Sequence, residues 1–139
     1  MAMITPKMKA LFEDHKKSHK YFALATASKD GVPNVVPIGF LWVANDKEIW
    51  VIDNYMNKTL ANIKENPVAA VYALAGEGHD CIQVKGACRY FDFGPDYEAA
   101  VKMAHEKNPA FPAKGLIKIA VTDVYDTAPG EHAGMKYKE

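Results

Sequence analysis

The first hydrophobic repeat along the chain has the spacing of a helix. Leu11, Phe12 and His15 follow Met8 by three, four and seven residues, which places all four on one helix face. Thr5-Pro6 comes just before them, and it supplies a threonine that can cap the helix and a proline that suits its first turn. The pattern predicts an amphipathic helix over residues 6–18.

After this helix, hydrophobic residues alternate with small or polar ones, which is the period of a β-strand. Asp30-Gly31 follows the first alternating run and is a strong signal for a tight hairpin turn. Later apolar runs, separated by Gly, Pro and Asn, indicate further strands and two more helices. We predict strands at 21–28, 34–43, 47–53, 68–74, 81–91 and 116–124, and helices at 57–66 and 95–108.

The order of these elements limits the fold class. The early hairpin makes its strands antiparallel, so a parallel sheet of strand–helix–strand units is excluded. With 139 residues, 49% of them hydrophobic, the chain can form one compact core but not two. We expect one mainly β domain over 1–139, an antiparallel barrel with helices at its openings, an N-terminal helix within 1–20 and a polar tail over 129–139.

The strand predicted over 34–43 is apolar on both faces, and each face needs cover. The rest of the chain leaves little to cover the second face, so we expect a partner subunit or a flat aromatic ligand there. Proline and glycine in this run also predict an edge strand, a bulge or a close approach by a ligand. One face carries Val35, Pro37, Gly39 and Leu41, and the other carries Val36, Ile38, Phe40 and Trp42.

Composition narrows the class of partner. The 17 basic and 17 acidic residues cancel, so no overall field favours nucleic acid or an anionic membrane, and a phosphate would have to be held locally. Residues 1–6 lack the pattern of a signal peptide, and the apolar runs are too short to span a membrane. We expect a cytoplasmic protein.

The two cysteines are not predicted to pair with each other. If 81–91 is one strand, Cys81 and Cys88 lie on opposite faces about 23 Å apart, too far for a disulfide. Free thiols suit a reducing compartment, and we interpret both as small buried hydrophobic residues.

Histidine and serine positions give no support for metal or hydrolytic chemistry. His15 and His19 are four residues apart and could share a metal, but no HExxH glutamate or third ligand accompanies them. We interpret the pair as a polar continuation of the helix face. Ser18 and Ser28 lie outside any GxSxG motif. The other histidines are interpreted as surface groups: His79, His105 and His132.

The segment 53–60 is the best candidate for a ligand site. A strand ends there, a short loop follows, and a helix opens on Asn57, Lys58 and Thr59. The free N–H groups and positive dipole end of such a helix, with a cation and a hydroxyl beside them, suit a phosphate. A plain capped helix with a solvated lysine is the alternative.

Three segments carry a resemblance to a known family. They are Ala-Thr-Ala-Ser-Lys-Asp-Gly-Val-Pro (25–33), Val-Val-Pro-Ile-Gly (35–39) and Asn-Lys-Thr-Leu-Ala-Asn-Ile-Lys-Glu-Asn-Pro (57–67). With them, the run 22–90 resembles the flavin proteins related to pyridoxamine 5′-phosphate oxidase. The resemblance implies a split β-barrel of about six antiparallel strands with short helices. It also implies a homodimer that holds FMN at its subunit interface.

The resemblance also implies which residues hold the cofactor. It puts the FMN phosphate on Asn57, Lys58 and Thr59. It lays the flavin ring against the backbone of Val36, Pro37 and Ile38, and beside Val51, Ile52 and Asp53. Phe111 falls where relatives offer an aromatic ring from the other subunit, and core packing is an equal interpretation of that residue.

Departures from the family pattern limit the activity. Where the oxidases that make pyridoxal phosphate carry basic residues, this chain has Val36, Leu41 and Asn57, so a second phosphate lacks a charge partner. We therefore expect an FMN-dependent oxidoreductase or electron-transfer protein that does not make pyridoxal phosphate. We assign no side chain to catalysis, because the flavin would carry the electron chemistry. The alternatives are a split barrel using coenzyme F420 or haem, and a cofactor-free dimeric binding module. The substrate or redox partner, small molecule or protein, stays open.

Overall fold

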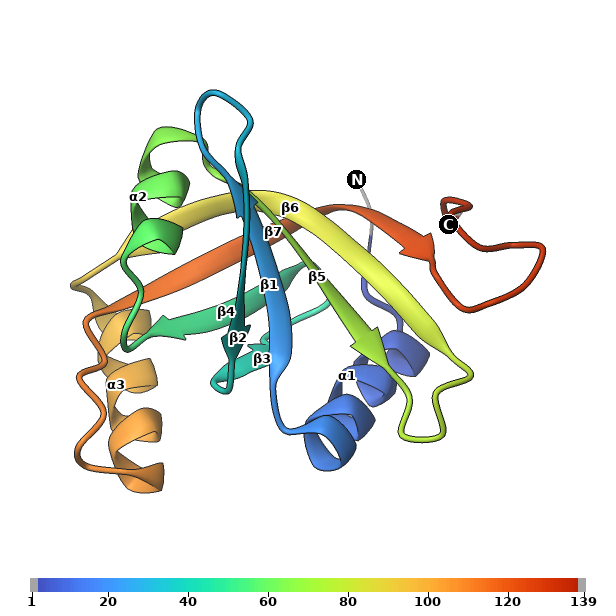
Figure 1. Ribbon diagram of the computed structural model, residues 1–139. Coiled ribbons are helices and arrows are strands. Elements are labelled where there is room, and N and C mark those ends of the chain that lie inside the picture. Colours follow the sequence, from blue (N-terminus) through green and yellow to red (C-terminus); the bar gives the residue numbers. More distant parts are fainter. Residues whose placement is uncertain (1–2, 138–139) are drawn as a thin grey trace.

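The structure is a computed structural model that describes residues 3–137 (Figure 1). The outermost positions of the predicted domain, 1–2 and 138–139, lie outside the described residues. The helices are α1 (Pro6–His19), α2 (Lys58–Glu65) and α3 (Pro95–Lys107). The strands are β1 (Phe22–Ala27), β2 (Pro33–Ile38), β3 (Leu41–Val43), β4 (Glu48–Asp53), β5 (Val68–Leu74), β6 (Cys81–Phe91) and β7 (Gly115–Asp126).

All seven strands form one antiparallel sheet in the order β2-β1-β5-β6-β7-β4-β3. β2 and β3 are therefore the two outer strands, yet only Gly39 and Phe40 join them. So short a connection spans about 11 Å at most, so the sheet must curl until its edges meet. Just after this bend, the Phe40 carbonyl accepts the N–H of Ile52 at 3.1 Å, which extends the pairing of β3 with β4 by one residue. The antiparallel barrel, with helices at its openings, is confirmed (Figure 1).

The predicted strand 34–43 is two strands, so the sheet has seven strands rather than about six. The chain bends at Gly39, where an added Cβ would touch the Tyr21 ring at 3.4 Å. Pro37 lies on β2, which pairs only with β1, opposite Ala23. A proline lacks the N–H needed between two neighbouring strands, and the predicted edge position is confirmed.

The expectation that the chain has little left to cover Val36, Ile38, Phe40 and Trp42 was wrong. Ile38 and Phe40 are only 9% and 7% exposed within this single chain, because the bend after β2 turns them into the barrel and toward α3. Val36 and Trp42 pack against the same cores. The uncovered side of β2 is the opposite one, where Val35 is 65% exposed.

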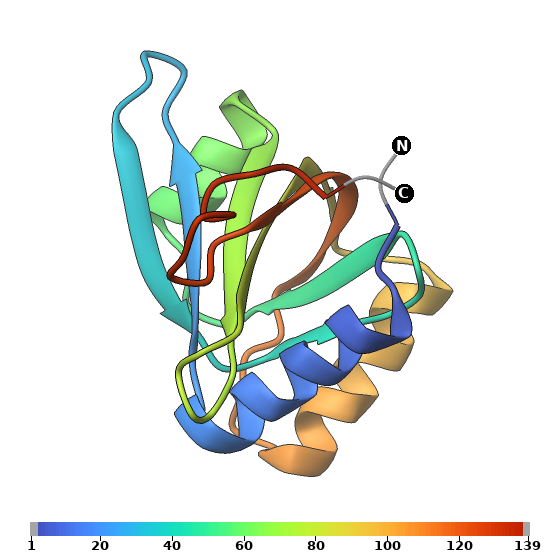
Figure 2. The same ribbon diagram turned by 90° about the vertical axis from the view of Figure 1, so that its right-hand side faces the viewer.

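Two adjoining hydrophobic clusters hold the fold together. The larger fills the barrel and takes Met8 and Phe12 from α1, with the Phe12 ring stacked on Phe22 at 5.7 Å. The smaller lies between α3 and the barrel: Phe40, Ile52, Ala100, Ala104, Ala113 and Leu116. Figures 1 and 2 show α1 and α3 both at the lower end of the barrel, on different sides of it.

His15 is buried, so its interpretation as a polar continuation of the helix face was wrong. The Leu74 N–H donates to His15 Nδ1 at 2.9 Å, and His15 Nε2 lies 2.8 Å from the Tyr21 carbonyl oxygen. Since a carbonyl only accepts, Nε2 carries the proton and the ring is neutral. The ring also stacks on Phe22 at 4.3 Å, so His15 joins α1 to β1 and β5. Residues 3–137 hold no group of three His, Cys, Asp or Glu side chains arranged for a metal.

Several other sequence-based expectations can be checked. Thr5 caps α1 by accepting the Met8 N–H at 3.2 Å, as predicted. Cys88 is buried, and burial raises the pKa of its thiol to about 12, whereas Cys81 is only half-buried. The predicted polar tail folds back at its described part, where Lys136 pairs with Tyr125 of β7. No helix in the described part of the chain could cross a membrane.

Candidate functional site

The structure brings together the segments that the sequence singled out. β2 ends beside β4 through the bond between Phe40 and Ile52. β4 runs directly into the loop before α2, and Thr59 in the first turn of α2 accepts a hydrogen bond from Asn34 of β2 at 3.0 Å. These bonds connect the predicted site segments 36–38, 51–53 and 57–59 through β2, β4 and the start of α2.

The start of α2 presents unused donors. Asn57 occupies the N-cap position, but its side chain makes no capping hydrogen bond, and helical bonding begins with the Ala61 N–H on the Asn57 carbonyl. Lys58 is exposed and takes part in no ion pair within residues 3–137. A positive helix end and a free cation thus lie side by side, as a phosphate requires.

Thr59 differs from its neighbours because it is 2% exposed. Its hydroxyl accepts from Asn34, whose amide also donates to Thr26 at 3.2 Å, and Asn62 donates to the same Thr26 hydroxyl at 3.1 Å. This network fastens α2 to β1 and β2. A ligand at the helix start would therefore meet the Thr59 N–H rather than the predicted hydroxyl.

The loop between β4 and α2 is fixed from both sides. Asp53 is fully buried, and its Oδ1 accepts the Met56 N–H at 2.9 Å. The Lys114 ammonium donates to the Met56 carbonyl at 3.2 Å and lies 3.8 Å from Asp53 Oδ1. Asn54 accepts the Ala113 N–H at 2.9 Å. These contacts hold the loop against the segment before β7, so the start of α2 has a defined position.

Asp53 Oδ2 is the only buried side-chain oxygen or nitrogen of the described chain without a hydrogen-bond partner. The Tyr90 hydroxyl donates to the Lys114 carbonyl at 3.3 Å. The pKa of Tyr90 is raised to about 12, first by burial and then by the negative charges of Asp53 and Asp92. Tyr90 can lie there because Gly115 has no side chain: a Cβ would meet its hydroxyl at 2.2 Å.

The predicted ring-contacting residues offer mainly backbone. Val51, Ile52 and Asp53 are each at most 3% exposed. Val36 is half-buried, while Pro37 is exposed on the outer side of β2. Because β2 pairs on one side only, its other edge leaves N–H and C=O groups unpaired by the sheet, which could meet the polar edge of a planar ligand.

Phe111 packs within its own chain. Its half-buried ring meets the Phe40 ring edge-to-face, with 6.4 Å between the ring centroids. The Trp42 ring also meets Phe40 edge-to-face, at 5.6 Å between centroids. Core packing is thus its role in the single chain, and contact with a partner's flavin stays a prediction. Sequence reasoning missed Lys114, which lies 58 residues from its contact Met56 and has no local signal.

Comparison with known proteins places the chain among characterised and uncharacterised relatives. The family model for pyridoxamine 5′-phosphate oxidase matches residues 4–128. An uncharacterized protein of Methanocaldococcus jannaschii is 36% identical over 113 residues, which cover 80% of this chain and 75% of that protein. The crystal structure of HupZ from Group A Streptococcus is 26% identical, with a TM-score of 0.78, over 95% of this chain and 100% of that one.

More distant structures share the fold. An FMN-binding protein from Syntrophomonas wolfei matches with 19% identity and a TM-score of 0.72, over 88% of this chain and 89% of that one. An F420 reductase and the heme storage protein HutZ from Vibrio cholerae match with TM-scores of 0.63 and 0.66. The chain therefore belongs to the pyridoxamine 5′-phosphate oxidase-like split-barrel family, whose members bind FMN, F420 or haem.

Proposed function

We propose that this chain is an FMN-binding flavoprotein that works as an oxidoreductase or electron-transfer protein and does not make pyridoxal phosphate. The observation that carries the proposal is the start of α2, where the N-cap side chain of Asn57 leaves the first N–H groups uncapped and Lys58 is unpaired within residues 3–137. A phosphate dianion would satisfy both. Neither a haem nor a cofactor-free module needs this arrangement.

In this proposal the chain binds and orients the cofactor, and the flavin when bound supplies the electron chemistry. Asn57, Lys58 and the Thr59 N–H hold the phosphate. The free edge of β2 over 36–38 and the end of β4 over 51–53 lie along the ring. The bonds among Asp53, Met56 and Lys114 support the fit, because they fix the loop that leads from the ring to the phosphate.

The proposal includes a homodimer with the cofactor at its interface. The three helices lie at the barrel openings and none covers the outer face of β1 and β2 (Figures 1 and 2). Val35, Val68 and Tyr72 on this side of the sheet are 65%, 47% and 41% exposed. Small residues between them leave a shallow groove of about 420 Å³, lined in part by Ala25, Ala27, Ala70 and Ala87.

A second copy is the proposed occupant of this face. A twofold contact places the same patch of both copies face to face. A patch with charges of one sign would repel its copy, so the patch should carry both signs of charge or none. This face is largely apolar and bears Lys85 directly opposite Asp123 at its border. The chain's net charge of zero adds no repulsion between copies.

The test compares FMN with riboflavin, which differ only by the phosphate, in titrations of the purified full chain. Lys58→Met should weaken FMN binding by about tenfold or more, because it removes a cation facing a dianion, and should leave riboflavin unchanged. Lys64→Met, at the other end of the same helix, is the matched control and should leave both affinities unchanged.

Two results would contradict the proposal. Equal affinities for riboflavin and FMN would mean that no phosphate site exists. A visible spectrum of the purified protein dominated by haem or F420, with no exchange for added FMN, would assign a different cofactor.

A further inference from the structure

Two lysines from different helices approach the same aromatic ring. Lys16 lies on α1 and Lys107 ends α3, and each ammonium nitrogen is 5.5 Å from the centroid of the Phe40 ring. Phe40 itself is 7% exposed. An aromatic face attracts a cation, but two cations converging on one ring also repel each other.

This repulsion is not offset by an ion pair in the described part of the chain. None of the ion pairs among residues 3–137 includes Lys16 or Lys107. The pKa of Lys16 is lowered, first by burial and then by the charge of Lys107. Lys107 also lies at the negative end of the α3 dipole, which favours a cation there. The fold thus brings two positive charges together, and neither has an ion-pair partner within residues 3–137.

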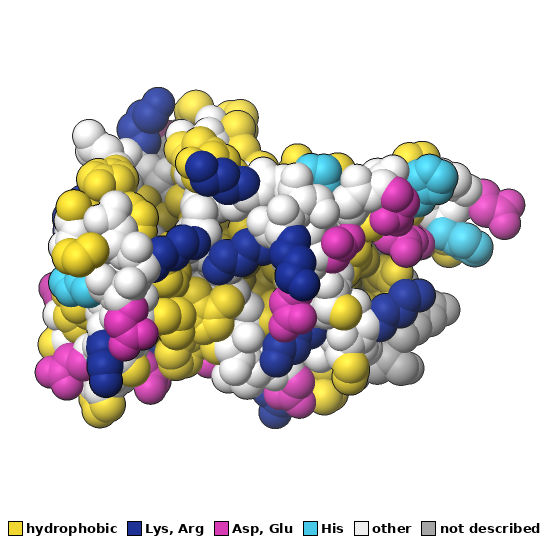
Figure 3. Space-filling model, turned by 90° about the horizontal axis from the view of Figure 1, so that it is seen from below, with side chains coloured by type: hydrophobic (Ala, Val, Ile, Leu, Met, Phe, Trp, Pro, Cys, Tyr) yellow, Lys and Arg dark blue, Asp and Glu magenta, His cyan; other side chains and the backbone are white. Residues whose placement is uncertain are grey.

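The floor beneath the two lysines is apolar and aromatic. Phe40 meets Trp42 and Phe111 edge-to-face, at 5.6 and 6.4 Å between ring centroids. Seen from the end of the barrel where α1 and α3 lie, hydrophobic side chains line a hollow, with lysine and arginine side chains along one side of it (Figure 3). A planar apolar group could lie against the aromatic rings around Phe40 while its charge meets Lys16 and Lys107.

We propose that Lys16 and Lys107 bind the negatively charged group of a small aromatic anion, a carboxylate or a phosphate ester, whose apolar part lies against the Phe40 cluster. This site is separate from the start of α2. Because the Phe40 carbonyl accepts the N–H of Ile52, the proposed site adjoins the end of β4 that is proposed to contact the flavin ring. The assignment of this anion as substrate rests on the proposed function, whereas anion binding itself does not.

The two lysines do not replace the basic residues that the oxidases making pyridoxal phosphate carry on the second strand. Those positions hold Val36 and Leu41 here. Lys16 and Lys107 come from α1 and α3 instead, so the proposed anion site differs from the phosphate site of those oxidases. They lie 91 positions apart in the sequence, so no local motif could indicate that they share a site.

Tryptophan fluorescence can test the site directly, because Trp42 and Trp50 are the only tryptophans and both belong to this aromatic group. We would titrate the full chain with phenyl phosphate, benzoate and the neutral analogue benzyl alcohol. At least one anion should change the fluorescence with saturation, and benzyl alcohol should bind at least about tenfold more weakly.

Lys16→Met and Lys107→Met keep the apolar stems and remove one charge each. Either should weaken anion binding by about tenfold. Lys17→Met and Lys102→Met, exposed on the same two helices, are the matched controls and should not weaken it. Equal binding of benzyl alcohol, or anion binding unchanged in the Lys16→Met, Lys107→Met double variant, would overturn the proposal.

An FMN titration of the same variants separates this inference from the proposed function. If the anion site is right, Lys16→Met and Lys107→Met retain the FMN affinity that Lys58→Met loses. Should the first two variants lose FMN instead, the lysines hold the flavin phosphate and the substrate assignment falls. Anion binding by a chain that binds no FMN would leave the site intact and remove only its assignment to a flavin substrate.

Discussion

The carbonyl of Phe40 accepts the N–H of Ile52 at 3.1 Å, and this bond extends the pairing of β3 with β4 up to the bend that follows β2. The Phe40 ring lies 5.5 Å from the ammonium nitrogens of both Lys16 and Lys107. On the facing strand, Asp53 follows Ile52 directly and begins the loop before α2. The two candidate anion sites are therefore connected through this pair of residues, one at the start of α2 and the other between α1 and α3.

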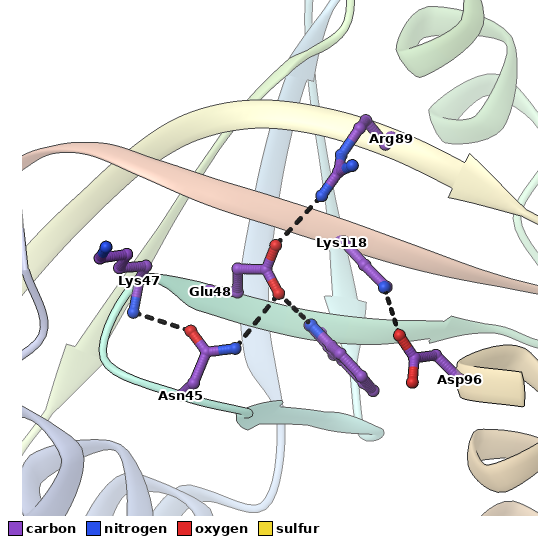
Figure 4. Close-up of polar contacts among 7 residues, drawn as sticks. Asn45, Lys47, Glu48, Arg89, Asp96 and Lys118 are labelled. Carbon is purple, nitrogen blue, oxygen red and sulfur yellow. Dashed lines mark hydrogen bonds and ion pairs between the residues drawn. The ribbon is translucent and has the colours of Figure 1, made fainter. Parts of the chain in front are cut away.

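A second network lies between β4, β6 and β7, where Glu48 is the central acceptor (Figure 4). Glu48 accepts from Trp50 Nε1 at 3.0 Å and from Arg89 at 3.1 Å. Nearby, Lys118 pairs with Asp96 of α3 at 2.6 Å and lies 4.8 Å from the Trp50 ring centroid. These contacts tie α3 and Trp50 to the barrel, so the fluorescence reporter has a fixed environment.

Replacing His15 by phenylalanine should destabilise the fold. The ring could still stack on Phe22, but the Leu74 N–H and the Tyr21 carbonyl would lose their partners in a partly buried region. We expect a loss of about 2–4 kcal/mol in the free energy of unfolding, measured with urea. His79→Phe in the exposed β5–β6 loop is the control and should change stability little. A His15 variant as stable as the wild type would show that the two bonds contribute nothing.

Replacing Lys114 by methionine should loosen the loop before α2. The buried carboxylate of Asp53 would lose the ammonium at 3.8 Å, and the Met56 carbonyl would lose its donor. We expect a stability loss of about 1–2 kcal/mol, moderated because Lys114 is half-exposed. Amide hydrogen exchange of residues 54–60 should accelerate more than that of the β5 core. Uniform acceleration across the chain would contradict a local role.

Alkaline pH should destabilise the protein in part through Tyr90. Its pKa is raised from 10.0 to about 12 in the folded state, first by burial, so folding favours the neutral phenol. This contribution is complete below pH 10 and is lost as the pH rises from about 10 to 12. Tyr90→Phe should therefore show a smaller fall in stability over this interval, followed by urea unfolding at each pH. Cys88 titrates in the same range, so Cys88→Ala should be compared in parallel.

Local patterns predicted the elements well because each rests on neighbours in the sequence. The Thr5-Pro6 start and the Asp30-Gly31 turn are such signals, and both lie where the structure has a helix start and a hairpin. Contacts over long separations were not predictable. The periodicity of 34–43 continues through Gly39, so nothing in it indicates that the chain there passes from one edge of the sheet to the other.

The same limit explains which site residues were found. Asn57 and Lys58 belong to one short motif at a helix start. Both side chains are exposed in the structure, as a ligand site at a helix start requires. Lys114 reaches the site only through the fold, because β7 pairs with β4 and brings it beside Asp53. His15 was misjudged because helical spacing marks it as part of the buried face while its polarity favours the surface.

The outer face of β2 gives the last prediction, which concerns assembly. Val35 is 65% exposed and lies opposite Ala25 on β1. The small side chain of Ala25 leaves the outer surface beside Val35 shallow and apolar. If a second copy covers this face, the wild-type chain of 15.4 kDa should sediment at twice that mass at micromolar concentration.

Val35→Asp places a charge in the proposed interface without touching either core, since its side chain points away from the barrel. It should sediment as a monomer and bind FMN at least about tenfold more weakly, because an interface site is incomplete in one chain.

Met103→Asp, on the exposed side of α3 where Met103 is 44% exposed, is the matched control and should stay dimeric with its FMN affinity unchanged. Both variants should melt near the wild-type temperature, since neither residue is buried in the chain. A wild type that sediments as a monomer while holding FMN would rule out the interface site, and the apolar face of β1, β2 and β5 would then need another partner.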